Sequence, residues 1–567
     1  MSSTCSQIIT DEPVRLGKTS ATLSYFCVYN PSLGPTEENA KDQILYYTAK
    51  KVVPADIKMK QVGLAQALVN FTSTFSQQSI QNVHSQKNRM VFFEPEPGFW
   101  MHMCVELGIS RKQIKDPKGK DKLVTEYLDS QLNDRALECV LKVGYEQFKL
   151  LNGTFSALLY GIDQTNRQRT RALMHAIEEF FSDWIWRWDF ENVVASFTTT
   201  VFNGVPIRPI LRSNYMRVNT MDKHIQENFE HATSHIMVLD HAHGLVYRSP
   251  SLSIYDVRSL RKFVMKRVEK YHQQEKKSAA SKKDLKLTSL KSLTKTLSNT
   301  HILNYFSTGS KSTEPTPSTS TESEQTDDVR FHETSEYSKQ GVYLTGLVES
   351  TAIGMNGEER PITKTDIIRV YLSSKKRRFH KSGLIWCFLL KATSHSEELL
   401  SDPSFYSDLE NQMMSQNLDS LTSTIVDNIN SAEEKSLQLE KNFKCFYYDN
   451  TTLAIKSTLM ESNIVNNEML LQLLEIKDDF ENIARTSEVY TRSTNNYWIA
   501  GHRIYNGLSA SGDETSMARS SLYECSVELD DYIEMYLVAA KKDTSLADVE
   551  DTLKKMTQSL LDTMHVG

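Results

Sequence analysis

The chain has 567 residues and a mass of 64.9 kDa, which is too large for one hydrophobic core and suggests about three domains. Hydrophobic residues make up 39% of it and charged residues 24%, which excludes a wholly disordered chain and a disulfide scaffold. The net charge of −6 hides a basic stretch over residues 258–295 and an acidic, Ser/Thr-rich stretch over 314–336, and we expect no nucleic-acid partner.

The sequence offers no route into or across a membrane. No apolar run approaches the roughly 20 residues that span a bilayer, and residues 1–18 lack the apolar middle of a secretory signal. The seven cysteines form no CxxC pair and are expected to be reduced thiols in the cytosol. Any membrane contact is therefore expected to be peripheral.

The first predicted unit has the order strand, strand, helix, strand, strand, helix. The expected strands are 23–30, 43–49, 89–94 and 99–109, and the expected helices are 57–76 and 123–155. Helical spacing in the first helix predicts that its apolar residues pack on the hairpin: Val62, Leu64, Ala65, Leu68, Val69, Phe71 and Phe75. The second helix is expected to bury Leu128, Leu132, Leu137, Val140, Leu141, Tyr145 and Phe148.

Two further units of the same kind follow a helical connector at 171–190. The second is expected to contain helices near 216–232 and 255–272 and strands at 235–240 and 245–249. The third is expected to contain strands at 341–348, 366–373, 384–392, 444–450, 453–459 and 496–506, helical regions at 396–441 and 465–484, and terminal helices. The fold class is therefore α/β (α+β), with three units that each have an antiparallel sheet flanked by helices.

We predict these domain boundaries: a first domain at 20–160, a helical connector at 161–210, a second domain at 211–275, an insert at 276–340 and a third domain at 341–567. The insert has few large apolar residues in its second half and is expected to be disordered.

Residues 283–307 of the insert differ from the rest of it. Leu287, Leu290, Leu293 and Leu297 fall on one helical face, and Lys291 and Lys295 lie among serines and threonines on the other side. This pattern suits shallow insertion into an anionic or phosphoinositide-containing membrane. The alternative is a helix that docks on the protein itself or forms only briefly.

An ordered series of motifs in the first unit resembles the Ccz family of vacuolar fusion proteins. The series is YNPSLGP (29–35), VGL (62–64), FTSTFS (71–76), HSQKNR (84–89), FFEPEPGFWM (92–101) and KLLNGTF (149–155). KCFYYDNTTLAIKST (444–458) and NNYWIAGHR (495–503) also resemble the family. The insert has no counterpart that can be assigned residue by residue.

The resemblance implies three longin domains and a heterodimer with a homologous Mon-type subunit. Such a pair catalyses GDP release from a Rab-seven-type GTPase on late endosomal and vacuolar membranes, and neither subunit is expected to act alone. The first longin domains of the two subunits would form the GTPase platform. A competing interpretation is a longin adaptor or tether that binds other trafficking proteins without catalysing exchange.

Three groups of residues in the family motifs are candidates for contact with the GTPase or the partner subunit. They are Tyr29, Asn30 and Pro31 in the first hairpin, Gln86, Lys87, Asn88 and Arg89 before the third strand, and Glu94 and Glu96 in the next turn. The alternative for the first group is a turn signature in which Asn and Pro set the backbone angles. For the second it is a solvated loop or a turn that holds the next strand in register.

Patterns that would indicate covalent chemistry or a metal are weak. Glu94 and Glu96 neighbour Trp100 on one turn, whereas glycosidase carboxylates come from separate elements. His241 and His243 lack a third ligand, and GLSASG (507–512) is not the nucleophile elbow because Ser511 replaces its second glycine. The basic run 375–381 suits a solvated hairpin tip, a phosphoinositide contact or a nuclear localisation signal. We therefore expect no catalytic residue, metal or cofactor.

Overall fold

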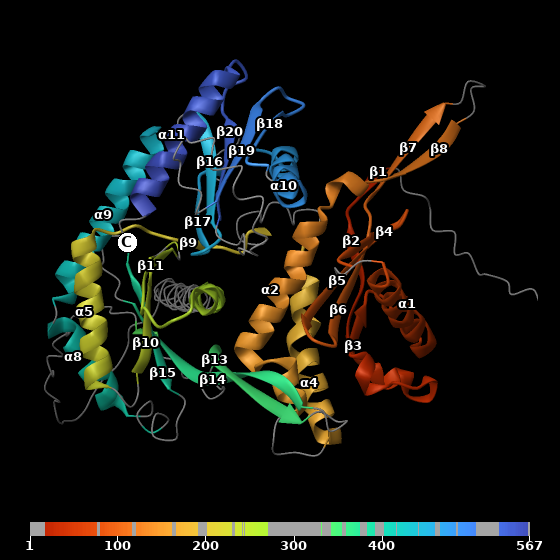
Figure 1. Cartoon of the computed structure of the whole chain (residues 1–567), viewed down its shortest axis with the longest axis horizontal. Coiled ribbons are helices and arrows are strands. Elements are labelled where there is room, and N and C mark those ends of the chain that lie inside the picture. The colour runs from red at the N-terminus through yellow and green to blue at the C-terminus, as the bar shows by residue number, and fades with distance from the viewer. Residues whose placement is uncertain are drawn as a thin grey trace, which may run out of the picture.

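The computed structural model describes most of the chain outside its termini and insert. The described residues are 17–75, 80–115, 121–160, 166–190, 201–229, 233–240, 242, 244–269, 330–331, 342–353, 359–374, 383–391, 398, 402–415, 417–439, 442–459, 465–483, 486–505 and 532–564. They form three α/β domains and a small β arm (Figure 1). The predicted fold class is confirmed.

The first domain is built on a five-stranded antiparallel sheet in the order β3-β2-β6-β5-β4. Its strands are β2 (Thr22–Tyr29), β3 (Ile44–Ala49), β4 (Asn82–His84), β5 (Asn88–Glu96) and β6 (Phe99–Glu106). Its helices are η1 (Pro31–Leu33), η2 (Glu37–Gln43), α1 (Ala55–Ser73), η3 (Asp129–Gln131), α2 (Asp134–Asn152), α3 (Phe155–Tyr160), α4 (Asn166–Trp184) and η4 (Ile185–Arg187).

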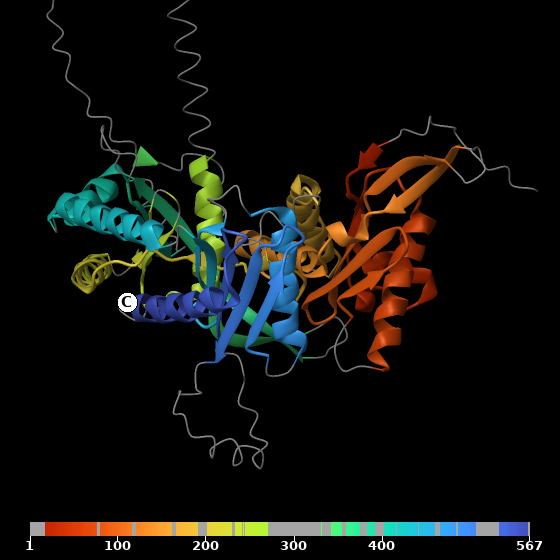
Figure 2. The same ribbon diagram turned by 90° about the horizontal axis from the view of Figure 1, so that it is seen from above.

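Helices cover both faces of this first sheet (Figure 2). Because strand side chains alternate between faces, Phe26 and Val28 of β2 join the core beneath α2, α3 and α4. Cys27 and Tyr29 point the other way and join a smaller cluster beneath α1. The sheet is therefore sandwiched, with α1 on one side and α2 on the other.

A β arm projects from the first domain, and the sequence pattern did not reveal it. It consists of β1 (Gly17–Thr19), β7 (Ile109–Lys115) and β8 (Asp121–Tyr127) in the order β1-β7-β8. The predicted helix over 123–155 is therefore wrong at its start, and α2 begins at Asp134. Asn133 caps α2 because its Oδ1 accepts a hydrogen bond from Ala136 N at 3.0 Å.

The second domain is assembled from two separate stretches of the chain. Its sheet has the order β11-β10-β15-β14-β12, with β13 also paired to β14. The strands are β10 (Thr233–Leu239), β11 (Leu245–Arg248), β12 (Arg330–Phe331), β13 (Val342–Ile353), β14 (Glu359–Ser374) and β15 (Ile385–Lys391). One face packs on α5 (Arg212–Asn228), α8 (Pro403–Ser415) and α9 (Leu418–Leu439), and the other on a helix over 254–269.

The predicted boundary at residue 341 does not follow this sheet. β15 pairs with β10 along its length, so that Met237 lies opposite Cys387, and β13, β14, β15, α8 and α9 thus belong to the second domain. The sequence prediction assigned them to the third domain because hydrophobic period identifies a strand but not its partner.

The third domain has a six-stranded sheet in the order β18-β19-β20-β16-β17-β9. Its strands are β9 (Val205–Pro206), β16 (Phe443–Asp449), β17 (Ala454–Ser457), β18 (Glu488–Arg492), β19 (Trp498–Tyr505) and β20 (Tyr532–Ala539). α10 (Asn467–Asn482) covers one face and α11 (Leu546–Met564) the other. The sequence prediction had only helices after residue 506 and missed β20, a buried strand that pairs with β16 and β19.

The cores of the first and third domains are continuous. One apolar cluster runs from Phe148 of α2 through Val201 and Phe202 to Phe446 and Leu473 of the third domain. The two domains therefore share buried surface instead of being joined only by a tether.

Candidate partner-binding surface

The first candidate group forms a turn that faces mainly inward. Tyr29 ends β2 and is buried, and Asn30 is fully buried at the start of η1. The Asn30 Oδ1 atom accepts hydrogen bonds from Ser32 N at 2.9 Å and from the Ser32 hydroxyl at 2.7 Å. Pro31 is the first residue of η1 and is partly exposed. This geometry matches a turn signature, which leaves Pro31 as the residue of the three that reaches solvent.

The second candidate group occupies the turn between β4 and β5, and its members differ in exposure. Gln86 and Lys87 are exposed and Asn88 is partly exposed. Ser85 closes the turn because its N donates to Asn88 O at 2.9 Å and its Oγ lies 3.0 Å from Asn88 N. Gln86 and Lys87 are therefore presented to solvent by a hydrogen-bonded turn.

Arg89 is buried and paired within the domain. Its Nε donates to Asp129 Oδ1 at 2.8 Å, and its Nη1 pairs with Asp134 Oδ1. His84 Nε2 lies 2.7 Å from the other oxygen of Asp134. Burial alone would lower the pKa of Arg89, but the hydrogen bond to Asp129 and the charges of both carboxylates outweigh it and raise this pKa. Arg89 thus ties β5 to the start of α2 and is not placed to reach a partner.

The two glutamates of the third candidate group have separate local roles. Glu94 is exposed, and its Oε1 accepts a hydrogen bond from Gly98 N at 2.8 Å across the β5–β6 turn. Glu96 accepts from the Tyr145 hydroxyl at 2.6 Å and from Ser156 N at 2.8 Å, at the start of α3. Glu96 therefore holds α3 against the sheet, and Trp100 is buried.

The outer face of α1 carries an apolar stripe of Ile57, Leu64 and Phe71, and Phe75 extends the stripe just beyond the end of the helix. Their exposed fractions are 45%, 49%, 63% and 78%. Two spacings of seven residues place Ile57, Leu64 and Phe71 within about 40° of one another around the helix. The rings of Phe71 and Phe75 lie edge to face, with centroids 5.0 Å apart.

The sequence prediction placed Leu64, Phe71 and Phe75 on the buried side of this helix, and that placement is wrong. Only Val62 and Ala65 of α1 are buried, with Leu68 and Val69 packed partly against the same cluster. The available signal was that apolar residues occur all round α1 instead of on one face, which is typical of a helix with a second partner.

Several candidates lie outside the described residues. They are the proposed membrane-binding residues Leu287, Leu290, Leu293, Leu297, Lys291 and Lys295, the basic run 375–381, and His241 and His243. Within the described ranges, no helix is long and apolar enough to cross a membrane, and no three His, Cys, Asp or Glu side chains are grouped as for a metal ion.

Comparison with known proteins identifies two of the domains. The family model for the first longin domain of INTU, CCZ1 and HPS4 matches residues 23–153, and that for the Intu longin-like domain 3 matches residues 439–507. A vacuolar fusion protein CCZ1 homolog of Xenopus laevis is 25% identical over 548 residues, which is 94% of each chain. Over almost its whole length the chain is therefore similar to proteins named vacuolar fusion protein CCZ1 homolog, and its first domain matches a longin model that includes CCZ1.

Other CCZ1 homologs match a shorter part of the chain. That of Nematostella vectensis is 31% identical over 215 residues, which is 37% of this chain and 43% of its own. That of Dictyostelium discoideum is 24% identical over 211 residues. The match to the first longin model covers nearly all of the five-stranded sheet together with α1 and α2, and so includes the apolar stripe.

Proposed function

We propose that the chain is one subunit of a heterodimeric guanine nucleotide exchange factor that activates a Rab-seven-type GTPase on late endosomes and vacuoles. In this role it would promote membrane fusion, vacuolar trafficking and autophagy. The proposal is supported by similarity over 94% of the chain to proteins named vacuolar fusion protein CCZ1 homolog. A Mon-type longin subunit would be the partner.

The observation that carries the proposal is the apolar stripe on α1. A solitary longin domain gains nothing from four large apolar side chains in water, because burying each fully is worth about 1.5–3 kcal/mol. A protein partner that covers them recovers this free energy. The stripe, with Gln86, Lys87 and Pro31 as exposed polar or turn residues of the same domain, is the surface we assign to the Mon-type subunit and the GTPase.

Exchange of this kind needs no covalent chemistry. An exchange factor binds the nucleotide-free GTPase more tightly than the GDP-bound form, and this difference in affinity releases GDP. The chain's contribution is then a correctly shaped surface, which the sandwiched sheet of the first domain holds in place.

Release of fluorescent GDP from candidate Rab GTPases tests the proposal, with the chain alone and with a Mon-type subunit. The double variant Leu64→Asp, Phe71→Asp is expected to lower partner affinity and exchange by more than roughly tenfold, since a charge replaces apolar contact. The matched control is Leu211→Asp, Met216→Asp, which changes side chains at the N-cap and in the first turns of α5 that are 57% and 51% exposed. This control should behave as wild type.

Absence of acceleration with every Rab tested, with and without the partner, would contradict the exchange proposal. Partner binding that depends on Leu64 and Phe71 but brings no GDP release would instead favour the longin adaptor or tether. Wild-type binding and exchange by the α1 variant would remove the stripe from the interface.

Peripheral membrane binding through residues 283–307 is a separate part of the proposal. The supporting pattern is the leucine face Leu287, Leu290, Leu293 and Leu297 beside Lys291 and Lys295. Leu290→Asp, Leu293→Asp should abolish flotation with anionic, phosphoinositide-containing liposomes. Ser289→Asp, Ser292→Asp adds the same charge without removing a leucine and should reduce flotation less. Equal flotation of all three proteins would exclude this segment as the anchor.

A further inference from the structure

One face of α2 meets both of the other domains. Arg135, Cys139 and Glu146 are separated by four and seven residues, which places them within about 40° of one another around the helix. The opposite face of α2 packs Leu137 and Phe148 into the core of the first domain. The same helix therefore carries the first sheet on one side and faces the rest of the molecule on the other.

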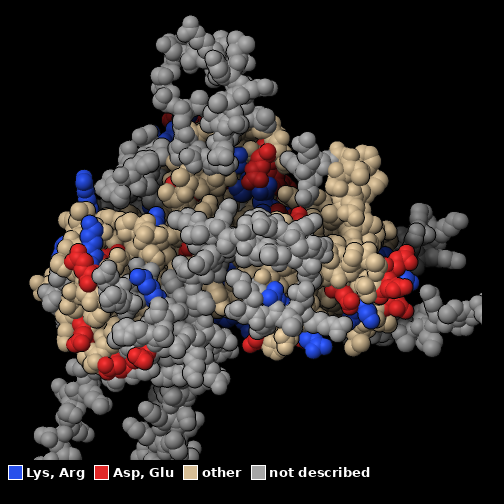
Figure 3. Space-filling view, turned by 60° about the horizontal axis from the view of Figure 1, so that its bottom comes forward, with Lys and Arg blue, Asp and Glu red and all other residues tan. Residues whose placement is uncertain are grey.

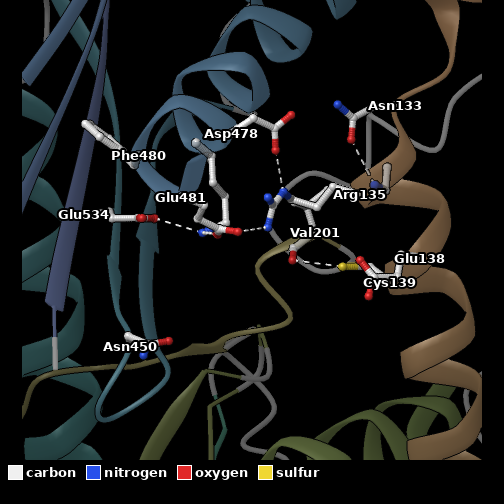
Figure 4. Close-up of polar contacts among 12 residues, drawn as sticks. Asn133, Arg135, Glu138, Cys139, Val201, Asn450, Asp478, Phe480, Glu481 and Glu534 are labelled. Carbon is white, nitrogen blue, oxygen red and sulfur yellow. Dashed lines mark hydrogen bonds and ion pairs between the residues drawn. The ribbon is translucent and has the colours of Figure 1, made fainter. Parts of the chain in front are cut away.

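Beside the apolar core that the two domains share, this face of α2 contacts the third domain through ion pairs. Arg135 Nε donates to Asp478 Oδ1 at 2.7 Å, and its Nη1 pairs with Glu481 Oε2 at 2.5 Å, both on α10 (Figure 4). Glu481 also pairs with Lys477 at 3.1 Å, and Lys477 Nζ lies 3.3 Å from the fully buried Glu534. In the space-filling view, acidic and basic side chains lie side by side in a hollow near the top of the picture (Figure 3). Arg135 thus joins a chain of charges that runs into the third sheet.

Arg135 and Glu481 stabilise the charged form of each other, whereas burial raises the pKa of Asp478 in spite of its pairing with Arg135. Burial alone would lower the pKa of Arg135, but Glu481 and Asp478 outweigh it and raise this pKa. Burial alone would raise the pKa of Glu481, but Lys477 and Arg135 outweigh it and lower this pKa. Removing one member of such a group leaves its partners charged and desolvated, so the group favours one relative position of the two helices.

The contact with the second domain lies three turns further along α2. The two carboxylate oxygens of Glu146 accept hydrogen bonds from Asn203 Nδ2 at 3.1 and 3.0 Å. Glu146 also pairs with Arg258 of the helix over 254–269, and Lys262 of that helix donates to Asn203 Oδ1. Asn203 has φ 49°, a conformation that asparagine tolerates better than most residues.

The third domain packs closely against the chain next to Asn203. A Cβ atom on Gly204 would lie 2.3 Å from the Ile455 side chain of β17. Between the two ionic contacts, Cys139 Sγ lies 3.2 Å from Val201 O, with the thiol as donor. Residues 201–205 therefore pass through a junction at which all three domains meet one face of α2.

We propose that the ion pairs and hydrogen bonds on this face of α2 couple the relative positions of the three domains, and we call them the α2 latch. The α2 latch consists of Arg135 and Glu146 with their partners Asp478, Glu481, Asn203 and Arg258. Apolar packing joins the domains, and the latch sets their relative position. Because both contacts are on one rigid helix, opening the third-domain contact loosens the second-domain contact as well. A ligand or partner that displaces the second or third domain therefore also shifts the first sheet, which packs on α2 and carries α1.

Hydrogen exchange of the full chain, with small-angle scattering, tests this inference without any exchange assay. Arg135→Glu is expected to speed amide exchange at least roughly tenfold in α10 and in the helix over 254–269, and to raise the radius of gyration. Adding Asp478→Arg should reverse these changes in part, since Glu481 keeps Lys477 as a partner. The control Lys142→Glu changes a charge on the same face that pairs with Glu138 of α2 itself, and it should leave both helices unchanged.

Unchanged exchange and radius in Arg135→Glu would overturn the latch. Loosening that Asp478→Arg does not reverse would assign the effect to packing and not to charge, which also overturns it. A response confined to α10 would overturn the coupling. If Arg135→Glu does not accumulate as folded protein, Arg135→Gln is expected to show the same changes at smaller size.

Discussion

Arg89 lies two residues from the exposed Lys87, yet its guanidinium is buried against Asp129 and Asp134. The turn between β4 and β5 is a candidate contact site from its sequence; Gln86 and Lys87 are exposed there, and their contact with a partner stays a prediction. The burial and pairing of Arg89 could not be predicted from the neighbouring sequence, because its partners lie 40 and 45 residues further along the chain.

Replacing Arg89 or Lys87 tests which of the two residues stabilises the folded domain. Arg89→Met is expected to lower the free energy of unfolding by about 1–3 kcal/mol, since the partly buried Asp134 and the exposed Asp129 both lose their partner. Lys87→Met should change it by less than about 0.5 kcal/mol. Hydrogen exchange of β5 amides measures both values. Equal stability of the two variants would contradict the structural role of Arg89.

His102 gives the first domain a dependence on pH. It is fully buried beneath α1, its Nε2 lies 2.9 Å from the Tyr25 hydroxyl, and burial lowers its pKa from 6.5 to about 4. As pH falls below 6.5, His102 becomes protonated in the unfolded chain but stays neutral in the folded domain. Stability is therefore lost between pH 6.5 and about 4.

His102→Gln should remove this loss and keep a polar group near Tyr25. Between pH 7 and pH 5, the opening free energy of β6 amides is expected to fall by about 2 kcal/mol less in His102→Gln than in wild type. Hydrogen exchange at the two pH values gives the comparison. Parallel losses in the two proteins would show that His102 does not titrate in this range.

At the scale of elements, α1 and α2 show when hydrophobic periodicity predicts the buried face of a helix and when it does not. α2 has one apolar face, and of the seven residues expected to be buried, all but Leu128 are buried. α1 has apolar residues all round, so the sequence could not tell which face meets the sheet. β8 and β20 were missed because a short apolar run fits a strand and a helical turn equally well, and only their sheet partners decide.

Two helical glycines are expected to respond in opposite ways to alanine. A Cβ atom on Gly144 of α2 would lie 2.6 Å from the Trp184 ring of α4, whereas one on Gly63 of α1 would have no heavy atom within 4 Å. Gly144→Ala should therefore cost about 1–3 kcal/mol through overpacking. Gly63→Ala should gain about 0.5–1 kcal/mol from helix propensity. Hydrogen exchange in each helix measures the signs, and a stabilising Gly144→Ala would contradict the close crossing of α2 and α4.

At the scale of the whole molecule, the number of α/β domains was predictable from length and pattern, but their composition was not. The second sheet takes β10 and β11 from before the insert and β13, β14 and β15 from after it. No hydrophobic period records that Met237 pairs with Cys387. The charges of the α2 latch were equally hidden, because Arg135 and Asp478 are 343 residues apart.

A cut within the insert should leave the second domain assembled. Residues 1–310 and 311–567, produced together as two chains, are expected to copurify, because β10 and β15 pair over six residues and share two apolar clusters. A cut between residues 450 and 451, in the β16–β17 turn of the third domain, serves as the control and should reduce recovery. Failure of the first pair to associate would contradict the shared sheet.

The divided second domain also affects synthesis on the ribosome. β10 emerges 150 residues before the strand that completes its pairing, since Met237 waits for Cys387. At translation rates of roughly 5–20 residues per second, β10 spends about 8–30 s without its partner strand β15. During this interval Ile236, Val238 and Tyr247 are open to chaperones and to aggregation. A nascent chain of this protein is therefore most vulnerable in the time between completion of its first domain and emergence of residue 391.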